Sequence, residues 1–356
     1  IDIDDFTSLN LSGRWNWASL KMEDQFGTAL EGHHFFNEFN PGVGVTRKFG
    51  DISVYASYKE SSRNPSVAEL GCADPDQPCR LPNSFQADPP LDMVKNRNIE
   101  MGARGNKSYK LFGIDHNINW NASAYAGRNF NDIIFIGGNR VGTGYFRNVG
   151  NTQRMGTEIG LSGKLGNKWS WYGNYSYVRA SFETSQKISS PGHTENPHEA
   201  EGSGTFASDA AATTDQETGE AAESYQIQVG PGDAIPGLSP HVSRIGIGYS
   251  PTENFSMFVD TEYNSNQFYR GDENNAQGQK VPGYFLLNAS AEFKLPLKVN
   301  SPFSTVLFLD GRNLLDTNFE TGGIIAENEV EGTGGSGTFV TPGQPLSIMG
   351  GMHIRW

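Results

Sequence analysis

The chain has 356 residues, of which 36% are hydrophobic, 12% are aromatic and 43 are glycines, and its net charge is −13. Such an acidic chain is a poor partner for nucleic acid, whose phosphates would repel it. No apolar run reaches the ~18–20 residues that a membrane-spanning helix needs. The opening stretch `IDIDDFTSLN` is acidic, so we expect no signal peptide there. A membrane β-barrel remains compatible with these observations, because only every second strand residue meets lipid.

Twelve stretches show the two-residue period of a β-strand with two unlike faces. In residues 9–21, for example, Leu11, Trp15 and Trp17 alternate with polar side chains. The other stretches lie near 35–49, 51–60, 97–105, 113–127, 151–165, 168–180, 241–250, 254–265, 283–295, 303–313 and 345–356. No stretch predicts a convincing amphipathic helix, so we expect an all-β fold.

The connections between these stretches alternate between short and long. Short ones are `FGD`, `RGNKSYK`, `LGNKW`, `SPTEN` and `LPLKVNSP`, and long ones cover 23–34, 61–96, 128–150, 184–240, 266–282 and 314–344. Short turns at one rim and long loops at the other are typical of an outer-membrane barrel, with the long loops outside. We therefore expect a transmembrane antiparallel β-barrel with extracellular loops near 61–96 and 184–240.

A soluble β-sandwich or β-propeller is the main alternative fold. Sandwich loops do not alternate so regularly in length, and a propeller would show a repeat of ~40–45 residues, which this sequence lacks. Many strands instead carry charged or amide residues on one face and Trp, Tyr, Phe, Leu or Ala on the other. These faces suit a wet lumen and surrounding lipid, respectively.

The last predicted strand has an apolar face that runs to the final residue. Ile348, Met352, Ile354 and Trp356 belong to this face, which we expect to meet lipid. His353 and Arg355 belong to the opposite, luminal face.

The chain contains two cysteines, Cys72 and Cys79, separated by six residues rich in proline and aspartate. We expect a disulfide that closes this loop in an oxidising compartment such as a periplasm or a cell surface. Two free thiols are the alternative.

Four ordered stretches resemble TonB-dependent outer-membrane receptors. `VYASYKESSRNPSVAEL` resembles a strand that rises into an Arg-x-Pro-Ser-x-x-Glu-Leu pattern, and `PGDAIPGLSPHVSRIGIGY` resembles a descending strand after a Pro-Gly-rich loop. `FLLNASAEFKL` with `LFLDGRNLLDTNFE` resembles the penultimate strands, including Asn313, Leu314 and Asp316, and `PLSIMGGMHIRW` resembles the terminal strand. A terminal aromatic also resembles the assembly signal of outer-membrane barrels, which assigns that role to Trp356.

The resemblance implies a 22-stranded barrel around a plug that couples to an inner-membrane TonB complex. With twelve strands and no plug sequence, residues 1–356 are expected to be the C-terminal portion of such a receptor. A second chain or a missing segment would then supply the plug and the remaining strands, because two unpaired sheet edges are prohibitive in lipid. Closure of the twelve strands on themselves is the alternative.

Candidate ligand-binding residues are rim aromatics that could stack on a ligand and inward-facing arginines that could bind an anion. They are Arg154, Arg244, Tyr263, Phe268, Tyr269 and Arg312. The aromatics also suit an interfacial girdle, and the arginines also suit ion pairs with luminal acids or with the plug.

No metal site or cofactor is predicted. The segment 184–240 holds nine acidic residues, together with His193 and His198, but their spacing fits a solvated loop better than a Ca²⁺ site. His33 and His34 are expected to be a polar pair at the rim. The family's haem motifs flank a histidine, and none lies between Ser66 and Asn96.

The expected function is therefore that of a bacterial outer-membrane receptor that moves a scarce small molecule, above all a ferric siderophore, into the periplasm with TonB-derived energy. Vitamin B12, a sugar or a peptide is an alternative cargo. A self-contained pore or translocator is an alternative class. No `GxSxG` elbow or other catalytic constellation predicts an enzyme.

Overall fold

The computed structural model describes residues 1–23, 31–72, 79–80, 91–137, 143–190, 192–193, 226–296, 304–328 and 335–355. Twelve strands form one antiparallel sheet in which neighbours in the sequence are neighbours in space. They are β1 (Thr7–Met22), β2 (Gly32–Phe49), β3 (Ile52–Arg63), β5 (Val94–Leu111), β6 (Ile114–Phe130), β9 (Thr152–Leu165), β10 (Trp169–Phe182), β13 (His241–Thr252), β14 (Phe255–Asn264), β17 (Tyr284–Lys294), β18 (Ser304–Arg312) and β21 (Ser347–Arg355). All twelve predicted strands and the all-β class are thus confirmed.

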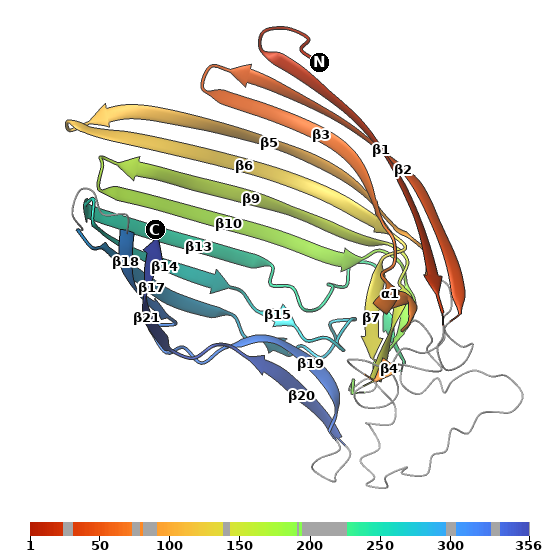
Figure 1. Ribbon diagram of the computed structural model, residues 1–356. Coiled ribbons are helices and arrows are strands. Elements are labelled where there is room, and N and C mark those ends of the chain that lie inside the picture. Colours follow the sequence, from red (N-terminus) through yellow and green to blue (C-terminus); the bar gives the residue numbers. More distant parts are fainter. Residues whose placement is uncertain are drawn as a thin grey trace, which may run out of the picture.

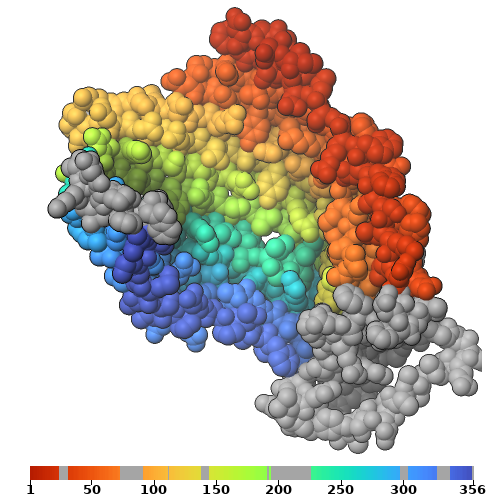
Figure 2. All heavy atoms as spheres, viewed as in Figure 1, coloured from red at the N-terminus to blue at the C-terminus, as the bar shows by residue number. Residues whose placement is uncertain are grey.

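The sheet is a curved wall with two edges. Figures 1 and 2 show it running from the red strand β1 to the blue strand β21. Among the described strands, β1 pairs only with β2 and β21 pairs only with β18. The twelve strands therefore do not close on themselves in this structure.

One face of the sheet is apolar across all twelve strands. The pairing register aligns Trp15 with Phe39 at one edge and Leu307 with Met352 at the other. These large side chains are exposed: Trp15 retains 65% of its accessible surface and Met352 retains 62%. The register places asparagine, serine and charged side chains on the opposite, polar face. Greater exposure of the larger side chains is what the convex side of a curved sheet produces, because neighbouring side chains diverge there.

The short turns join the strands at one end of the wall. The turn between β5 and β6 differs from the prediction, because residues 104–110 continue the strand instead of forming the connection. The turn itself is Phe112–Gly113, where φ is 50° and 77°. A two-residue hairpin turn of this hand requires positive φ at both positions, which Gly113 adopts without strain.

At the other end of the wall, the long connections contain small sheets of their own. These are β4 (Cys79–Arg80) with β8 (Thr143–Asn148) and β7 (Ile133–Gly137), β11 (Gln186–Ser189) with β12 (Gln226–Val229), β15 (Gln267–Phe268) with β16 (Lys280–Val281), and β19 (Glu320–Asn328) with β20 (Gly335–Pro342). A single helical turn, α1 (Val67–Leu70), follows β3. No described helix has the length and apolar character that crossing a membrane requires.

The buried apolar clusters lie mostly at this loop end. One joins Phe182 to Val149, Ile188 and Val229, and a second contains Leu70, Leu91, Val94 and Ile133. The described parts of these loops are therefore stabilised by buried apolar side chains. The wall itself leaves its apolar face exposed.

Cys72 lies beside α1 and is disulfide-bonded. The side chain of Cys79 lies outside the described residues, so its pairing with Cys72 stays a prediction.

Candidate functional site

The polar face of the wall carries a shallow groove lined by amide and hydroxyl side chains. Arg104, Asn119, Asn121, Ser162, Tyr172 and Asn174 contribute to it from β5, β6, β9 and β10. The strands place these groups on one face because alternate residues point the same way and the register between strands is regular. The groove offers many hydrogen-bond donors and acceptors together with one arginine and one aspartate, Asp51.

The three predicted arginines lie on this polar face, and each is paired with a carboxylate. Arg154 Nη1 is 3.1 Å from Asp132 Oδ2, and Arg244 Nη2 is 2.7 Å from Glu262 Oε2. Arg312 Nε is 3.1 Å from Asp310 Oδ1. They extend from β9, β13 and β18, and they do not converge on one another.

The three predicted aromatics occupy three different environments. Tyr263 lies on the apolar face, opposite Ser243 of β13 and Phe285 of β17, so it shares no face with the arginines. The ring of Phe268 lies 4.1 Å from Lys280 Nζ. Tyr269 is buried against Val281 and Ile325. The structure therefore does not gather the six candidates into one pocket.

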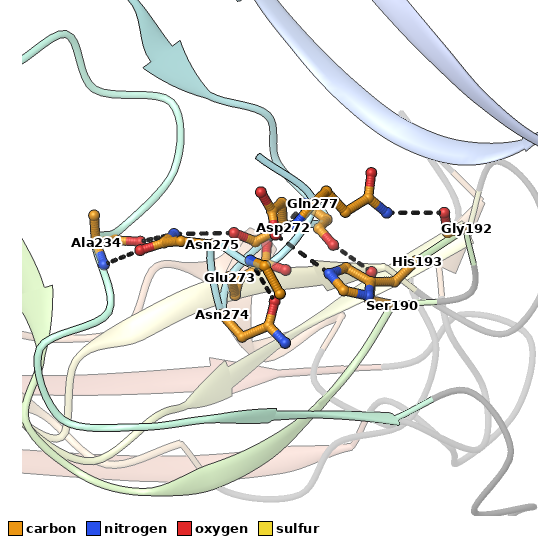
Figure 3. Close-up of polar contacts among 11 residues, drawn as sticks. Ser190, Gly192, His193, Ala234, Asp272, Glu273, Asn274, Asn275 and Gln277 are labelled. Carbon is orange, nitrogen blue, oxygen red and sulfur yellow. Dashed lines mark hydrogen bonds and ion pairs between the residues drawn. The ribbon is translucent and has the colours of Figure 1, made fainter. Parts of the chain in front are cut away.

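A buried polar centre ties the loops together instead, and Figure 3 shows it in close-up. His193, which follows β11, places Nε2 3.2 Å from Oδ1 of Asp272, which follows β15. Both side chains are fully buried. The backbone N–H of Gln277 also donates to Asp272 Oδ1, at 3.2 Å. Two loops that are 79 residues apart in the sequence thus meet through this side-chain hydrogen bond. The Ser190 hydroxyl adds a second contact by donating to the carbonyl oxygen of Gly271.

Glu273 is the second buried acid of this centre. Burial raises its pKa above the ordinary value of 4.5, and the negative charge of Asp272 adds to this effect. The Gly271 N–H, 2.9 Å from Oε1, and His193 act in the opposite direction without reversing the shift. Among the described residues, Glu273 Oε2 and Asp272 Oδ2 accept no hydrogen bond.

Asn275 and Gly192 extend the centre to neighbouring loops. The Ala234 N–H donates to Asn275 Oδ1 at 2.6 Å, and Asn275 Nδ2 donates to the carbonyl oxygen of Ala234 at 3.0 Å, as the dashed lines in Figure 3 mark. A Cβ added to Gly192 would lie 2.8 Å from the backbone of Ala326 in β19, so only glycine fits this approach. The described parts of the loops after β10, β14 and β18 therefore contact one another.

Sequence reasoning missed this centre as a unit. In the sequence, His193 belongs to an acidic loop, and Asp272 and Glu273 show no spacing that predicts a site. A histidine and an acid so far apart carry no local pattern that predicts their contact. His198 lies outside the described residues. Within the described part of the chain, no group of three His, Cys, Asp or Glu side chains is placed to hold a metal ion.

The predicted pair His33–His34 splits between the two faces of β2. His33 Nε2 lies 2.9 Å from the Ser19 hydroxyl, and the imidazole of His34 stacks on Phe36. Alternate strand positions point to opposite sides, so the two rings do not form one site.

Two of the sequence motifs that carry the resemblance prove to be local braces. Arg63 Nη1 is 2.7 Å from Glu69 Oε2, and Ser66 and Glu69 form a reciprocal capping box around α1. Asn313, almost fully buried, donates through Nδ2 to the carbonyl oxygens of Thr317 and Gln344. The first brace turns the chain into the loop after β3, and the second turns it out of β18.

The closing strand shows the two predicted faces. Ile348 and Met352 lie on the apolar face, and His353 stacks on Phe308 of β18 on the polar face, with ring centroids 4.8 Å apart. Trp356 lies outside the described residues, so its predicted role in assembly stays a prediction.

Comparisons with known proteins agree with this architecture. The structure resembles the siderophore receptor PiuA from Acinetobacter baumannii, with a TM-score of 0.62 and 16% identity over 99% of this chain and 42% of that one. It also resembles the copper transporter OprC (TM-score 0.61, 15% identity, 98% of this chain and 45% of that one). The ferric yersiniabactin uptake receptor FyuA from Yersinia pestis is similar as well (TM-score 0.58, 12% identity, 99% of this chain and 43% of that one).

The chain thus spans less than half the length of these solved proteins, and at these identities the likeness concerns the fold. No curated protein matches the sequence. A family match is nevertheless direct: residues 1–314 match the family described as "TonB dependent receptor-like, beta-barrel". The chain belongs to this family of TonB-dependent receptor β-barrels.

Proposed function

We propose that this chain forms part of the wall of a bacterial outer-membrane receptor that imports a ferric siderophore into the periplasm with energy from a TonB complex. The observation that carries the proposal is the continuous apolar face opposite a polar face across twelve strands. A wall of this kind suits lipid on one side and an aqueous passage on the other. The proposed plug and remaining strands would come from a second chain or from a segment outside these residues.

Two observations support a ferric siderophore as the cargo. Two of the similar structures are described as a siderophore receptor and a ferric yersiniabactin uptake receptor. The polar groove holds Arg104 and Asp51 among many hydrogen-bond partners, which suits an oxygen-rich ligand that places an anionic group beside the arginine. Arg154, Arg244 and Arg312 remain candidate ligand contacts in this proposal. A ligand that binds them would compete with the carboxylates that pair with them.

A self-contained pore is the weaker proposal. A closed barrel of twelve strands needs β1 to pair with β21. These two strands lie at opposite edges of the described sheet. The pore therefore requires a rearrangement of the wall, whereas the receptor requires only additional strands.

Growth under iron limitation tests the proposed cargo. A strain lacking the protein is grown with one ferric siderophore at a time as the iron source, beside the same strain complemented with the protein. We expect the deletion to abolish growth on at least one siderophore and complementation to restore it. Growth unaffected on every siderophore, with unchanged expression when iron is scarce, would move vitamin B12, sugar or peptide uptake ahead of iron uptake.

A further inference from the structure

A pair of arginines interrupts the apolar face at the loop end of the wall. Arg97 of β5 lies directly opposite Arg128 of β6 in the pairing register. The next pair on the same face, toward the middle of the wall, is Ile99 of β5 opposite Ala126 of β6. Ile99 is 55% exposed. The two guanidinium groups therefore project from the surface that is proposed to meet lipid, just beyond its apolar rows.

Like charges directly opposite each other destabilise a strand pair, so this arrangement needs a compensating interaction. Part of it comes from Phe130, whose ring centroid lies 5.0 Å from Arg97 Cζ and 5.4 Å from Arg128 Cζ. The electron-rich face of an aromatic ring attracts cations. One ring thus holds two guanidinium groups close together.

Two carboxylates supply another part of the compensation. Arg97 Nε lies 3.3 Å from Glu60 Oε1, and Arg128 Nε is paired with Glu183. Both contacts use the inner nitrogen of the guanidinium. In the described part of the chain, neither arginine donates a hydrogen bond through its terminal Nη atoms, and the side chains are 58% and 48% exposed. The outward ends of both groups are available to an anion.

The surroundings determine what kind of anion fits. A soluble anion needs only the cations, whereas this pair stands at the border of a broad apolar surface. A molecule with a phosphate head and hydrocarbon chains matches both parts: its oxygens suit the planar guanidinium forks, and its chains suit the apolar rows beneath. Charge complementarity and continuity with the apolar face therefore favour a lipid over a free anion or a protein.

We propose that Arg97 and Arg128, held by Phe130, bind the phosphate group of a lipid at the outward surface of the membrane. The assignment of this surface as outward rests on the proposed function, which places the long loops outside. The site fixes the height and rotation of β5 and β6 in the membrane. It needs no cargo, so it operates whichever small molecule the receptor carries.

Lipid that co-purifies with the protein tests the site. The protein is extracted from its own membrane in a mild detergent, washed, and analysed for phosphate-bearing lipid per protein molecule by mass spectrometry. The double variant Arg97→Gln/Arg128→Gln is expected to retain at least fivefold less of this lipid. A matched control, Arg14→Gln/Lys59→Gln, removes two positive charges from the polar face of β1 and β3, and it should retain the wild-type amount.

Add-back identifies the chemistry of the ligand. Lipid-stripped protein is titrated with fluorescent phosphatidic acid in neutral detergent, with diacylglycerol as the uncharged counterpart and inorganic phosphate as the competitor. We expect phosphatidic acid to bind about tenfold more weakly to the double variant, with Arg97→Lys/Arg128→Lys between the two. We also expect no binding of diacylglycerol and no displacement by millimolar phosphate.

Three results would overturn the proposal. They are equal lipid binding by the wild type and the double variant, equal losses in the charge-matched control, and complete displacement by inorganic phosphate, which would assign the site to a free anion. If the double variant failed to insert, Arg97→Lys/Arg128→Lys would carry the comparison. The cargo proposal fails independently of the lipid site. In that case the deletion strain would grow unchanged on every siderophore, while the wild-type protein would still bind the lipid.

Discussion

At the scale of single residues, Glu69 shows how a loop is fixed at the point where it leaves the wall. Burial alone would raise the pKa of this carboxyl, but hydrogen bonds from Arg63 and from the Ser66 N–H outweigh it and lower the pKa below 4.5. A lowered pKa means that the folded state prefers the ionised form. The contribution of Glu69 to stability is therefore present above its unfolded pKa and is lost as the pH falls through its folded pKa.

Replacing Glu69 tests this brace. We expect Glu69→Ala to destabilise the loop after β3 by about 1 kcal/mol, the usual value of a lost cap. Glu69→Gln keeps a side chain that can accept from the Ser66 N–H and should have a smaller effect. Hydrogen exchange of the amides in α1 measures both changes. Equal protection in Glu69→Ala and the wild type at neutral pH would show that the capping box is not stabilising.

The pKa of Glu273 is shifted in the opposite direction from that of Glu69. Its pKa is raised by burial, so the folded loop prefers the protonated acid. Its contribution to stability is fully present below the unfolded pKa and is lost as the pH rises through the folded pKa. The main physical cause of the raised pKa is that ionisation places a negative charge in the buried interior, and the charge of Asp272 adds to this effect.

The prediction is that the His193–Asp272 centre loosens as the pH rises. The amides of residues 271–277 should exchange faster at the upper end of a pH 5–8 series, after correction for the intrinsic pH dependence of exchange. Glu273→Gln should remove this trend, whereas Glu253→Gln at an exposed short turn should keep it. A trend that survives Glu273→Gln would assign it to another group.

At the scale of elements, each strand of the wall has one apolar face and one polar face. Ala124 of β6 lies opposite Met101 on the apolar face, while Asn121 of the same strand lines the polar groove. An arginine in the middle of a lipid-facing surface destabilises a membrane barrel by about 2–4 kcal/mol. The same residue facing the aqueous side meets water and is tolerated.

We therefore expect Ala124→Arg to lower the free energy of unfolding by about 2–4 kcal/mol and to reduce the amount of protein in the membrane. Ser123→Arg, the neighbouring residue on the polar face, lies opposite Gly102 and Glu158 and should fold and insert as the wild type does. Urea unfolding in lipid vesicles compares the two. An equal loss in both variants would mean that the faces are assigned incorrectly.

The strands of the wall could be predicted from the sequence because a two-residue period over ten or more residues is a strong local signal. The boundaries near the β5–β6 turn were wrong, since `KSYK` was interpreted as a turn although Tyr109 and His116 continue the pairing. Most of the strands in the long connections have only two to six residues, too few for a two-residue period to be evident, so the sequence does not predict them. In addition, β4 pairs with β8 of a different loop, and no local pattern predicts that pairing.

The candidate site could be predicted only in part, and for a physical reason. Periodicity placed Arg154, Arg244 and Arg312 on the polar face correctly, because a face is a local property. Their partners Asp132, Glu262 and Asp310 were not identified individually. The His193–Asp272 contact depends on how separate loops pack, and no local spacing encodes it. Tyr263 was grouped with the other rim aromatics, although the period of its own strand places it on the apolar face.

At the scale of the whole molecule, the open wall makes assembly the central question. The apolar face of β21 extends through Ile354 at 51% exposure, and the sequence continues this period to Trp356. We predict that Trp356→Ala lowers the amount of protein inserted into the outer membrane, while Trp356→Phe keeps most of it. Quantitative blotting of membrane fractions measures the difference. Wild-type insertion of Trp356→Ala would count against a role of this residue in assembly.

Uptake of a labelled ferric siderophore most directly tests whether the protein is an energy-coupled receptor. Cells with and without the protein receive the ⁵⁵Fe complex, with the proton gradient either intact or collapsed. We predict saturable accumulation of iron inside the cell that requires both the protein and the gradient, while binding at the cell surface persists when the gradient is collapsed. Accumulation that rises in proportion to concentration and continues without the gradient would contradict the receptor and support an open pore.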